Sequence, residues 1–273
     1  MTRPDRVKPG HRIGHKLGGS LITDKNQPHT ARSETLKRLA QEIAGALRMR
    51  QDLQLLIGHG SGSFGHVPAD QHGTRQGVSS AAGWWGFVEV YQEARALNQI
   101  VLESLLEAGL PVIAFPPSAA VIASDGKVQS WDLQPMQAAL VTDLIPLVNG
   151  DVILDTRRGG TILSTEELFA HLAVTLKPQR ILLAGIETGV WQDYPACKQL
   201  AASITPATFD LHDRALSGAA AVDVTGGMRQ KVESMLSLTG QMPGLESLIF
   251  SGEEPGLVYQ ALLGDRPGTL IRA

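Results

Sequence analysis

Residues 59–66, with the sequence HGSGSFGH, form the segment of this chain best suited to bind a phosphate group. They directly follow the apolar run LQLLI at 53–57. A buried strand that ends in closely spaced glycines leaves backbone N–H groups open to an anion, and a helix starting behind it adds its positive dipole end. His66 could donate a hydrogen bond to a phosphate oxygen. The segment therefore predicts an anion site.

A second glycine-rich segment, KLGGS at 16–20, begins with Lys16 and is followed by Lys25. Phosphoryl transfer needs fixed cations where charge gathers on the moving group, with backbone N–H groups close by. Two lysines around a glycine turn supply both. A tight strand-to-helix turn with surface lysines would read the same way, so this segment alone leaves both interpretations open.

The third segment is DVTGGMRQK at 223–231, in which Gly226 and Gly227 precede a predicted helix and Lys231 lies one turn into it. A glycine pair at a helix start suits a nucleotide phosphate. The alternative is a loop with a solvated lysine. The sequence has no G-x-x-x-x-G-K-[ST] motif, which excludes a P-loop enzyme. Residues 60–65 do match G-x-G-x-x-G, but no acidic residue follows at the distance of a dinucleotide site.

Strand-like and helix-like segments alternate along the chain. Strands are predicted at 13–17, 53–57, 111–115, 145–148, 152–154, 181–183, 248–250 and near 270, and helices at 36–47 (N-cap Ser33), 90–105, 168–176, 228–238 and 258–262. This order favours an α/β fold, a three-layer αβα sandwich around an open, mostly parallel sheet. Ligands of such sheets bind beyond the carboxyl ends of the strands, where all the glycine segments would lie. Residues 156–160, TRRGG, are predicted to form an exposed hairpin turn.

The composition of the 273 residues is that of an ordinary globular protein, with 43% hydrophobic residues and a net charge of -3. This charge makes nucleic acid and anionic membranes poor partners. No apolar run approaches the ~20 residues of a membrane helix, and the N-terminus lacks the apolar region of a secretory signal. The single cysteine, Cys197, fits a reducing compartment. A cytoplasmic protein is expected.

The motifs K-x-G-G-S with Lys25, H-G-S-G-S-F-G-H, N-G-D at 149–151 and D-V-T-G-G-M-x-x-K together resemble the amino acid kinase superfamily, and within it the isopentenyl phosphate kinases. The resemblance spans nearly all of the chain after residue 11. It implies the αβα fold of that superfamily, ATP with Mg²⁺, a phosphorylated isoprenoid as acceptor, and a homodimer. The implied reaction moves the γ-phosphoryl group of ATP to isopentenyl phosphate, giving isopentenyl diphosphate and ADP.

The resemblance also implies a role for individual residues. Lys16 and Lys231 would neutralise the transferring phosphoryl group, and Lys25 would hold the terminal phosphates of the nucleotide. His66 would donate a hydrogen bond to the acceptor phosphate, and Asp151 would orient the lysines. No side chain is assigned as a metal ligand.

The other residues expected to contact the substrates form two sets, one for the nucleotide and one for the acceptor. The nucleotide site would comprise Gly18, Gly19, Ser20, Lys25, Gly185, Gly189, Gly226 and Gly227. The acceptor site would comprise Gly60, Ser61, Gly62, Gly65, His66, Asn149 and Gly150. We expect residues 12–155 to form the acceptor-phosphate-binding lobe and 156–273 the nucleotide-binding lobe, joined by one continuous sheet, after a flexible segment at 1–11.

The chain departs from the pattern of the superfamily at three places. Asn149 stands where histidine is common, and residues 164–167, STEE, replace a typical S-G-D-D. Residues 184–190, AGIETGV, lack the two aspartates of T-D-x-D-G-V. The last change leaves the nucleotide contacts, and the choice of nucleotide, open.

Two other functions remain open from the sequence: a related kinase with a phosphonate acceptor such as fosfomycin, and a non-catalytic nucleotide-binding sensor of the same fold. Another open question is where an apolar isoprenoid tail would bind. Trp84, Trp85, Phe87 and Val90 could line a tail pocket, or serve helix packing or a dimer face. Trp191 is interpreted as structural.

Overall fold

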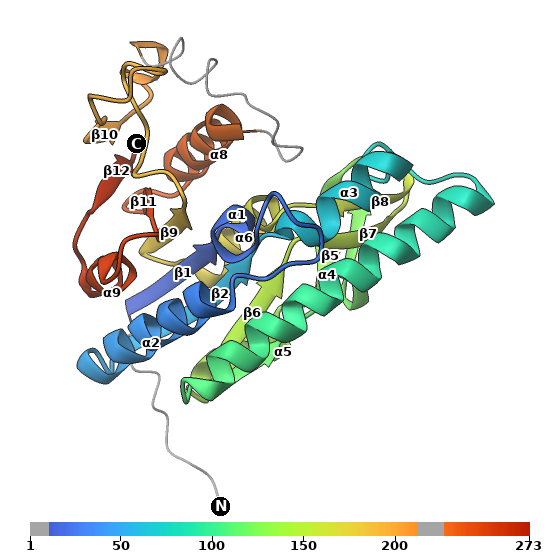
Figure 1. Ribbon diagram of the computed structural model, residues 1–273, viewed down its shortest axis with the longest axis horizontal. Coiled ribbons are helices and arrows are strands. Elements are labelled where there is room, and N and C mark those ends of the chain that lie inside the picture. Colours follow the sequence, from blue (N-terminus) through green and yellow to red (C-terminus); the bar gives the residue numbers. More distant parts are fainter. Residues whose placement is uncertain (1–10, 212–226) are drawn as a thin grey trace, which may run out of the picture.

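The structure, a computed structural model, describes residues 11–211 and 227–273. Its centre is an eight-stranded sheet in the order β10-β12-β11-β9-β1-β2-β6-β3 (Figure 1). The strands are β1 (His11–Leu17), β2 (Leu53–His59), β3 (Val112–Ala114), β6 (Ile145–Asn149), β9 (Arg180–Gly185), β10 (Ser203–Ile204), β11 (Glu246–Ser251) and β12 (Gly268–Ile271). Only the β11–β12 pair is antiparallel among the neighbours in this sheet. The prediction of a mostly parallel sheet is confirmed.

Helices cover both faces of this sheet and give the molecule three layers. On one face lie α2 (Ser33–Met49), α4 (Ala81–Glu107) and α9 (Leu257–Leu263), and on the other α5 (Gln134–Val141), α6 (Thr165–Leu176) and α8 (Gly227–Gln241). Successive side chains of a strand point to opposite faces. In β2, accordingly, Leu55 and Ile57 belong to the core on the α2 side, whereas Leu56 belongs to the core on the α6 side.

The register of the central strands brings the glycine segments together. Leu17 at the end of β1 pairs with His59 at the end of β2 on one side, and with Ala184 of β9 on the other. Because the three strands are parallel and end at the same level, the turns that follow them leave the sheet side by side. The sandwich thus places the predicted phosphate-binding segments at one edge.

A second sheet was not predicted. Its four strands, in the order β5-β4-β7-β8, are β4 (Val121–Ser124), β5 (Lys127–Trp131), β7 (Asp151–Asp155) and β8 (Gly159–Leu163). The sequence indicated only β7 as a strand, since the others are short and mix polar with apolar residues. β7 and β8 are antiparallel neighbours, with Asp155 paired to Gly159, so the hairpin predicted around 156–160 is confirmed.

Several helix starts differ from the prediction. The segment 59–66 is mostly helix, because α3 (Gly62–His72) begins directly after the short turn at 60–61. Gly19 and Ser20 likewise belong to a short helix, α1 (Gly19–Ile22). Ser33 is the first residue of α2 and not its N-cap, which is Arg32. A short 3-10 turn, η1 (Pro117–Ala119), precedes the second sheet.

The main sheet takes strands from both sides of residue 155, while the β7–β8 hairpin crosses that boundary. The division into two lobes remains a proposal. Residues 1–10 and Gly226 lie outside the described residues. Within 11–211 and 227–273, no helix has the length and apolar character to cross a bilayer.

Candidate active site

Three strand-end turns touch one another where β1, β2 and β9 leave the sheet. The backbone N–H of Gly18 donates to the carbonyl oxygen of Ala184 at 2.8 Å. A Cβ atom on Gly19 would lie 2.4 Å from the backbone nitrogen of Gly62. Only glycine fits at such a distance, because the neighbouring atom belongs to the backbone and cannot swing away. The start of α1 therefore rests directly on the start of α3.

Thr23 fixes this contact. Its hydroxyl donates to the carbonyl oxygen of Gly19 at 2.8 Å and accepts from the backbone N–H of Ser63 at 3.0 Å. One side chain thus bonds to both α1 and α3. The sequence analysis missed Thr23, since a lone threonine after an apolar pair carries no signal of its own.

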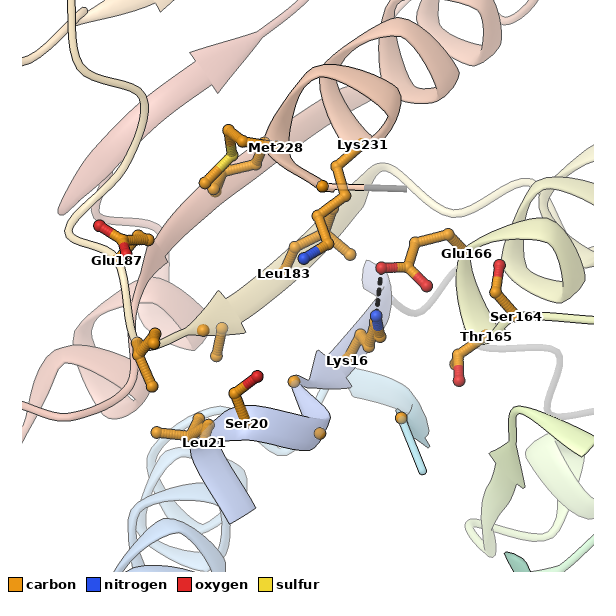
Figure 2. A pocket seen from close by; sticks show the side chains of 18 of the residues that line it. Lys16, Ser20, Leu21, Ser164, Thr165, Glu166, Leu183, Glu187, Met228 and Lys231 are labelled. Atoms are coloured by element: carbon orange, nitrogen blue, oxygen red, sulfur yellow. Dashed lines mark hydrogen bonds and ion pairs between the residues drawn. The ribbon is translucent and has the colours of Figure 1, made fainter. Parts of the chain in front are cut away.

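A cavity of about 320 Å³ opens above these turns. Most residues predicted for the two sites line it together: Lys16, Gly18, Gly19, Ser20, Lys25, Gly60, Ser61, Gly62, His66, Gly150, Gly185, Gly189, Gly227 and Lys231. They come from separate parts of the sequence, joined here by the parallel order of the strands. Figure 2 shows Lys16 and Lys231 entering this cavity from β1 and α8.

The central feature of the cavity is a buried ion pair between Lys16 and Glu166. The ammonium group of Lys16 donates to Oε1 of Glu166, and both side chains are at most 10% exposed. Lys231 extends from α8 toward the same carboxylate (Figure 2). Burial acts to raise the pKa of the Glu166 carboxyl, but the charges of Lys16 and Lys231 outweigh it and lower that pKa. Glu166 is therefore ionised at neutral pH.

The first turn of α6 holds Glu166 in place. Ser164 caps the helix by accepting from the N–H of Glu167, whose carboxylate accepts from the N–H of Ser164 in return. The hydroxyl of Thr165 donates to the carbonyl oxygen of His59 at 2.6 Å, which ties α6 to the end of β2. Glu166 was absent from the predicted site. Its signal was the acidic pair of STEE, noted only as a departure from S-G-D-D.

Asp151, expected to orient the lysines, lies elsewhere. Its carboxylate accepts from the backbone N–H groups of Ser118 at 3.1 Å and Val152 at 2.9 Å. Burial raises the pKa of Asp151 to about 6, although these hydrogen bonds act in the opposite direction. The carboxylate that accepts from Lys16 is that of Glu166. The contact expected for Asp151 is therefore made by Glu166.

A smaller cavity of about 50 Å³ adjoins the first and has His66, Ser61, Gly150 and Ile162 in common with it. Its other lining residues are Gly65, Ala69, Asp70, Arg75, Gln76, Val90, Ala94 and Asp151. Asn149 lines neither cavity; its side-chain amide donates to the carbonyl oxygen of Gly150 at 3.0 Å. The smaller cavity lies between α3, α4 and the second sheet.

The aromatic residues at the start of α4 are not part of this smaller cavity. Trp84 packs edge-on against Phe87 with 5.3 Å between ring centroids, and Trp85 is 75% exposed. A Cβ atom on Gly160 would lie 2.8 Å from the Phe87 ring, so this ring packs on β8. Val90, one turn further along, does line the cavity. The packing interpretation therefore holds for Trp84 and Phe87.

The side of the main cavity formed by β9, β11, α8 and the loop after β9 is largely apolar. Leu183, Met228 and Ile249 line it, together with Trp191 and Tyr194. Trp191, interpreted from the sequence as structural, thus also lines the cavity. Glu187, also in the lining, is the carboxylate that remains in the segment lacking the superfamily aspartates (Figure 2).

The loop after β9 folds back onto the sheet beyond these residues. A Cβ atom on Gly189 would lie 2.7 Å from the hydroxyl of Thr269, which accepts from the backbone N–H of Val190 at 2.8 Å. Gly189 thus lets the loop pack against β12, and so helps to close the apolar side of the cavity.

The cavity combines three features: lysines from separate elements, backbone N–H groups at the start of α3, and an apolar side. Fixed cations and oriented N–H groups stabilise the charge that gathers on a phosphoryl group in transfer. The apolar side suits a nucleotide base. Such a site can hold two phosphate-bearing molecules with their phosphates facing each other over Lys16.

Comparison with known proteins agrees with this geometry. The model of the amino acid kinase family matches residues 12–250. Isopentenyl phosphate kinase of Methanothermobacter thermautotrophicus is 33% identical, with 86% of this chain and 89% of that protein covered. The Haloferax volcanii enzyme of the same name is 34% identical over 82% of this chain and 86% of its own. A structure described as "X-ray structures of isopentenyl phosphate kinase" superimposes with a TM-score of 0.80 at 30% identity, covering 96% of this chain and all of the other.

Proposed function

Because the chain belongs to the amino acid kinase family, and within it to the isopentenyl phosphate kinases, we propose that it phosphorylates isopentenyl phosphate with ATP. The products are isopentenyl diphosphate and ADP. The observation that carries the proposal is that Lys16, Lys25 and Lys231 line the same cavity as the glycine turn that leads to His66. The retained lysines favour a catalyst over a nucleotide sensor.

The reaction forms one bond and breaks one. An oxygen of the acceptor phosphate attacks the γ-phosphorus, and the bond from that phosphorus to the oxygen bridging it to the β-phosphate breaks. ADP leaves with the electron pair. A phosphate monoester has its second pKa near ~6, so at neutral pH the acceptor is already an anionic nucleophile. The site needs no general base, and its work is positioning and charge neutralisation.

We assign the acceptor phosphate to the start of α3. The N–H of Gly60 is bonded to the carbonyl oxygen of Leu17, so the backbone N–H groups available to the phosphate are those of Ser61 and Gly62. The N-terminus of α3 adds its positive dipole end, and His66 would donate from the second turn. Lys16, held by Glu166, lies between this site and the nucleotide, where the γ-phosphoryl group crosses. Lys231 neutralises the same group from the other side.

We assign the nucleotide to the rest of the cavity. Lys25 and the turn at Gly18 and Gly19 would hold the terminal phosphates, and the apolar side near Met228 would hold the base. The superfamily aspartates are missing from this segment, so we assign Glu187 as the carboxylate that would accept hydrogen bonds from the sugar hydroxyls. ATP is the expected nucleotide.

Mg²⁺ would enter with the triphosphate. Among the described residues, the carboxylates that line the main cavity are those of Glu166 and Glu187, and the first of these is bonded to Lys16. No cluster of three or more metal-ligating side chains exists in the described parts of the chain. This donor set fits a Mg²⁺ ion held chiefly by phosphate oxygens and water, as is usual for this ion. When bound, it would neutralise charge on the β- and γ-phosphates.

The apolar tail of the acceptor would enter the smaller cavity. This cavity continues from His66 and has Ala69, Val90, Ala94 and Ile162 in its wall. At about 50 Å³ it suits a short tail. We further propose a homodimer in the cytoplasm, with the exposed Cys197 as a free thiol.

The decisive experiment measures ATP consumption with four acceptors: isopentenyl phosphate, dimethylallyl phosphate, fosfomycin and acetate. We expect turnover with the first two and none with acetate, which cannot occupy both the phosphate site and the tail cavity. Turnover with fosfomycin but not with isopentenyl phosphate would replace the proposal by the phosphonate kinase. Tight ATP binding without turnover on any acceptor would instead support the sensor.

A further inference from the structure

Lys25 lines the cavity although it lies on an exposed loop. Residues 24–30 connect α1 to α2 outside any helix or strand, and most of them are exposed. An isolated bridge between Thr23 and Ala31 closes the loop at its base, together with a hydrogen bond from the N–H of Asp24 to the carbonyl oxygen of Thr30 at 2.9 Å. These bonds shape the loop, but they do not fix where Lys25 points.

His29 attaches the far side of this loop to the body of the protein. Its Nδ1 atom is 2.6 Å from Oε2 of Glu93 on α4. Its ring packs edge-on against Phe64 of α3, with 5.9 Å between centroids. The backbone of His29 has φ 53°, a left-handed conformation that is unfavourable for a residue with a Cβ atom. Such a conformation persists where surrounding contacts impose it.

These contacts join two walls of the cavity. Phe64 is 4% exposed and precedes His66 by two residues in α3. The ring of His29 thus lies against the helix that presents the acceptor-side histidine, while its loop presents the lysine of the nucleotide side. His29 and Lys25 belong to the same loop, so a change in the position of the His29 ring would shift Lys25 relative to α3.

We propose that His29, held by Glu93, is a positioning residue that fixes Lys25 at the terminal phosphates of the nucleotide. The inference rests on the proposed function in one respect, the assignment of Lys25 to those phosphates. It predicts that the His29–Glu93 pair acts on nucleotide affinity only through Lys25.

The helix α4 offers a matched control. Glu89 lies one turn before Glu93, and its Oε2 atom is 2.9 Å from Nε2 of His72, the last residue of α3. This second pair has the same chemistry on the same helix, and His72 lies outside the loop of Lys25. Glu89→Ala therefore removes an equivalent histidine partner without touching the loop.

The test is the dissociation constant of Mg-ATP measured by calorimetry without acceptor. We expect Glu93→Ala and His29→Asn to weaken binding about threefold to tenfold, the range for loss of one partly exposed contact that orients a charge. Asparagine tolerates the left-handed backbone, so His29→Asn isolates the loss of the ring. Glu93→Gln, which keeps an acceptor for the ring N–H, should restore most of the affinity, and Glu89→Ala should match the wild type.

The same variants in a Lys25→Ala background decide the mechanism. If the pair acts through Lys25, Glu93→Ala causes no further loss once Lys25 is gone. An additional loss of the same size in that background would overturn the inference, as would unchanged ATP affinity in both Glu93→Ala and His29→Asn. Since no acceptor is present, failure of the enzyme to use isopentenyl phosphate would refute the proposed function and leave this result standing.

Discussion

A buried lysine remains a cation only where a carboxylate compensates for the loss of water. Lys16 and Glu166 meet this condition at the centre of the cavity, each nearly excluded from solvent. Lys231 adds a second positive charge that faces the same carboxylate. Among the residues that the structure describes, two lysines and one carboxylate thus lie close to the point where the phosphoryl group would cross, and Glu166 helps to hold Lys16 there.

Replacing Glu166 by glutamine should lower kcat more than it raises KM. The amide keeps the shape and can accept from Lys16, but it removes the negative charge of Glu166 from beside the two lysines and so increases their mutual repulsion. We expect kcat to fall about tenfold to hundredfold, as for a displaced electrostatic group. Glu166→Asp should recover part of the loss, and Glu233→Gln, an exposed carboxylate of α8, serves as control. Unaltered kcat in Glu166→Gln would remove the ion pair from the mechanism.

His66→Ala should reduce kcat/KM for isopentenyl phosphate at least about tenfold, since a hydrogen bond to a charged group contributes roughly 1.5–3 kcal/mol. Steady-state kinetics with varied acceptor measures the loss. The thermal midpoint of the variant should stay near that of the wild type, because His66 lies at the surface of two cavities. Kinetics identical to the wild type would show that another group binds the acceptor phosphate.

At the scale of elements, the site depends on how closely α1 and α3 approach. Both helices begin within a few residues of their strands, and their first residues touch through Gly19 and Gly62. Gly62 itself has φ +50°, and a Cβ atom there would lie 2.1 Å from the hydroxyl of Thr23. The glycines were identified from sequence as phosphate-binding residues. The structure adds that two of them are also needed for packing.

Gly19→Ala should therefore separate α1 from α3. We expect a loss of about 1–3 kcal/mol in unfolding free energy, the usual range for overpacking, together with loss of ATP binding. Urea unfolding and calorimetry measure the two effects. Gly240→Ala in α8 is the control, since no atom lies within 4 Å of the added Cβ and its φ is negative. It should match or exceed the stability of the wild type.

The second sheet is held together at its turns by Asp155. Its carboxylate accepts from the backbone N–H groups of Asp125, Gly126, Arg157 and Arg158. Burial acts to raise the pKa of Asp155, but these four donors lower it to about 2. The carboxylate thus joins the β4–β5 turn to the β7–β8 turn.

Asp155→Asn should lower the unfolding free energy by about 1.5–3 kcal/mol at pH 7, since it weakens charge-assisted hydrogen bonds. The folded pKa is below the unfolded one, so this stabilisation is present above pH 3.8 and disappears as the pH falls toward 2. The difference between wild type and variant in urea should be constant from pH 7 to pH 5 and smaller at pH 3. Asp125→Asn, which alters an exposed carboxylate, should have little effect at any of these values.

At the scale of the whole molecule, the free energy of unfolding depends on groups buried inside the eight-stranded sheet. β1 lies at the centre of this sheet, and His15 in that strand is fully buried, with its ring stacked 6.4 Å from that of Phe250. Burial lowers the pKa of His15 to about 4. The folded protein therefore keeps this imidazole neutral over a range in which the unfolded chain takes up a proton.

Stability should accordingly fall as the pH drops from 6.5 toward 4. The folded pKa lies below the unfolded value of 6.5, so the contribution is complete above 6.5 and decreases through that window. From pH 7.5 to pH 5 we expect His15 to account for about 2 kcal/mol of lost unfolding free energy. His15→Leu should remove that part of the slope in urea titrations at the two pH values. An unchanged slope would show that His15 is protonated at pH 5 in the folded state.

The alternation of strands and helices, and with it the mostly parallel sheet, could be predicted from the sequence, as could the edge of the sheet at which the cavity lies. The sequence also predicted that glycine-rich turns, Lys16, Lys25, Lys231 and His66 belong to one site, because these residue types and spacings follow from the chemistry of phosphate, and the structure brings them to one cavity. Local pattern was enough for these features. The short strands of the second sheet lacked such a pattern, since four or five residues of mixed polarity show no clear period.

Which side chains meet depends on the tertiary structure. Asp151 follows a glycine, and Glu166 lies in the capping segment STEE. From the sequence, Asp151 was predicted as the carboxylate that orients the lysines. The register of β1 against β2, with α6 bonded to the end of β2, places Glu166 beside Lys16. The contacts of His29, a loop residue, with Glu93 and Phe64 likewise depend on the tertiary structure. Such contacts arise from packing between segments far apart in the chain, and local sequence carries no record of them.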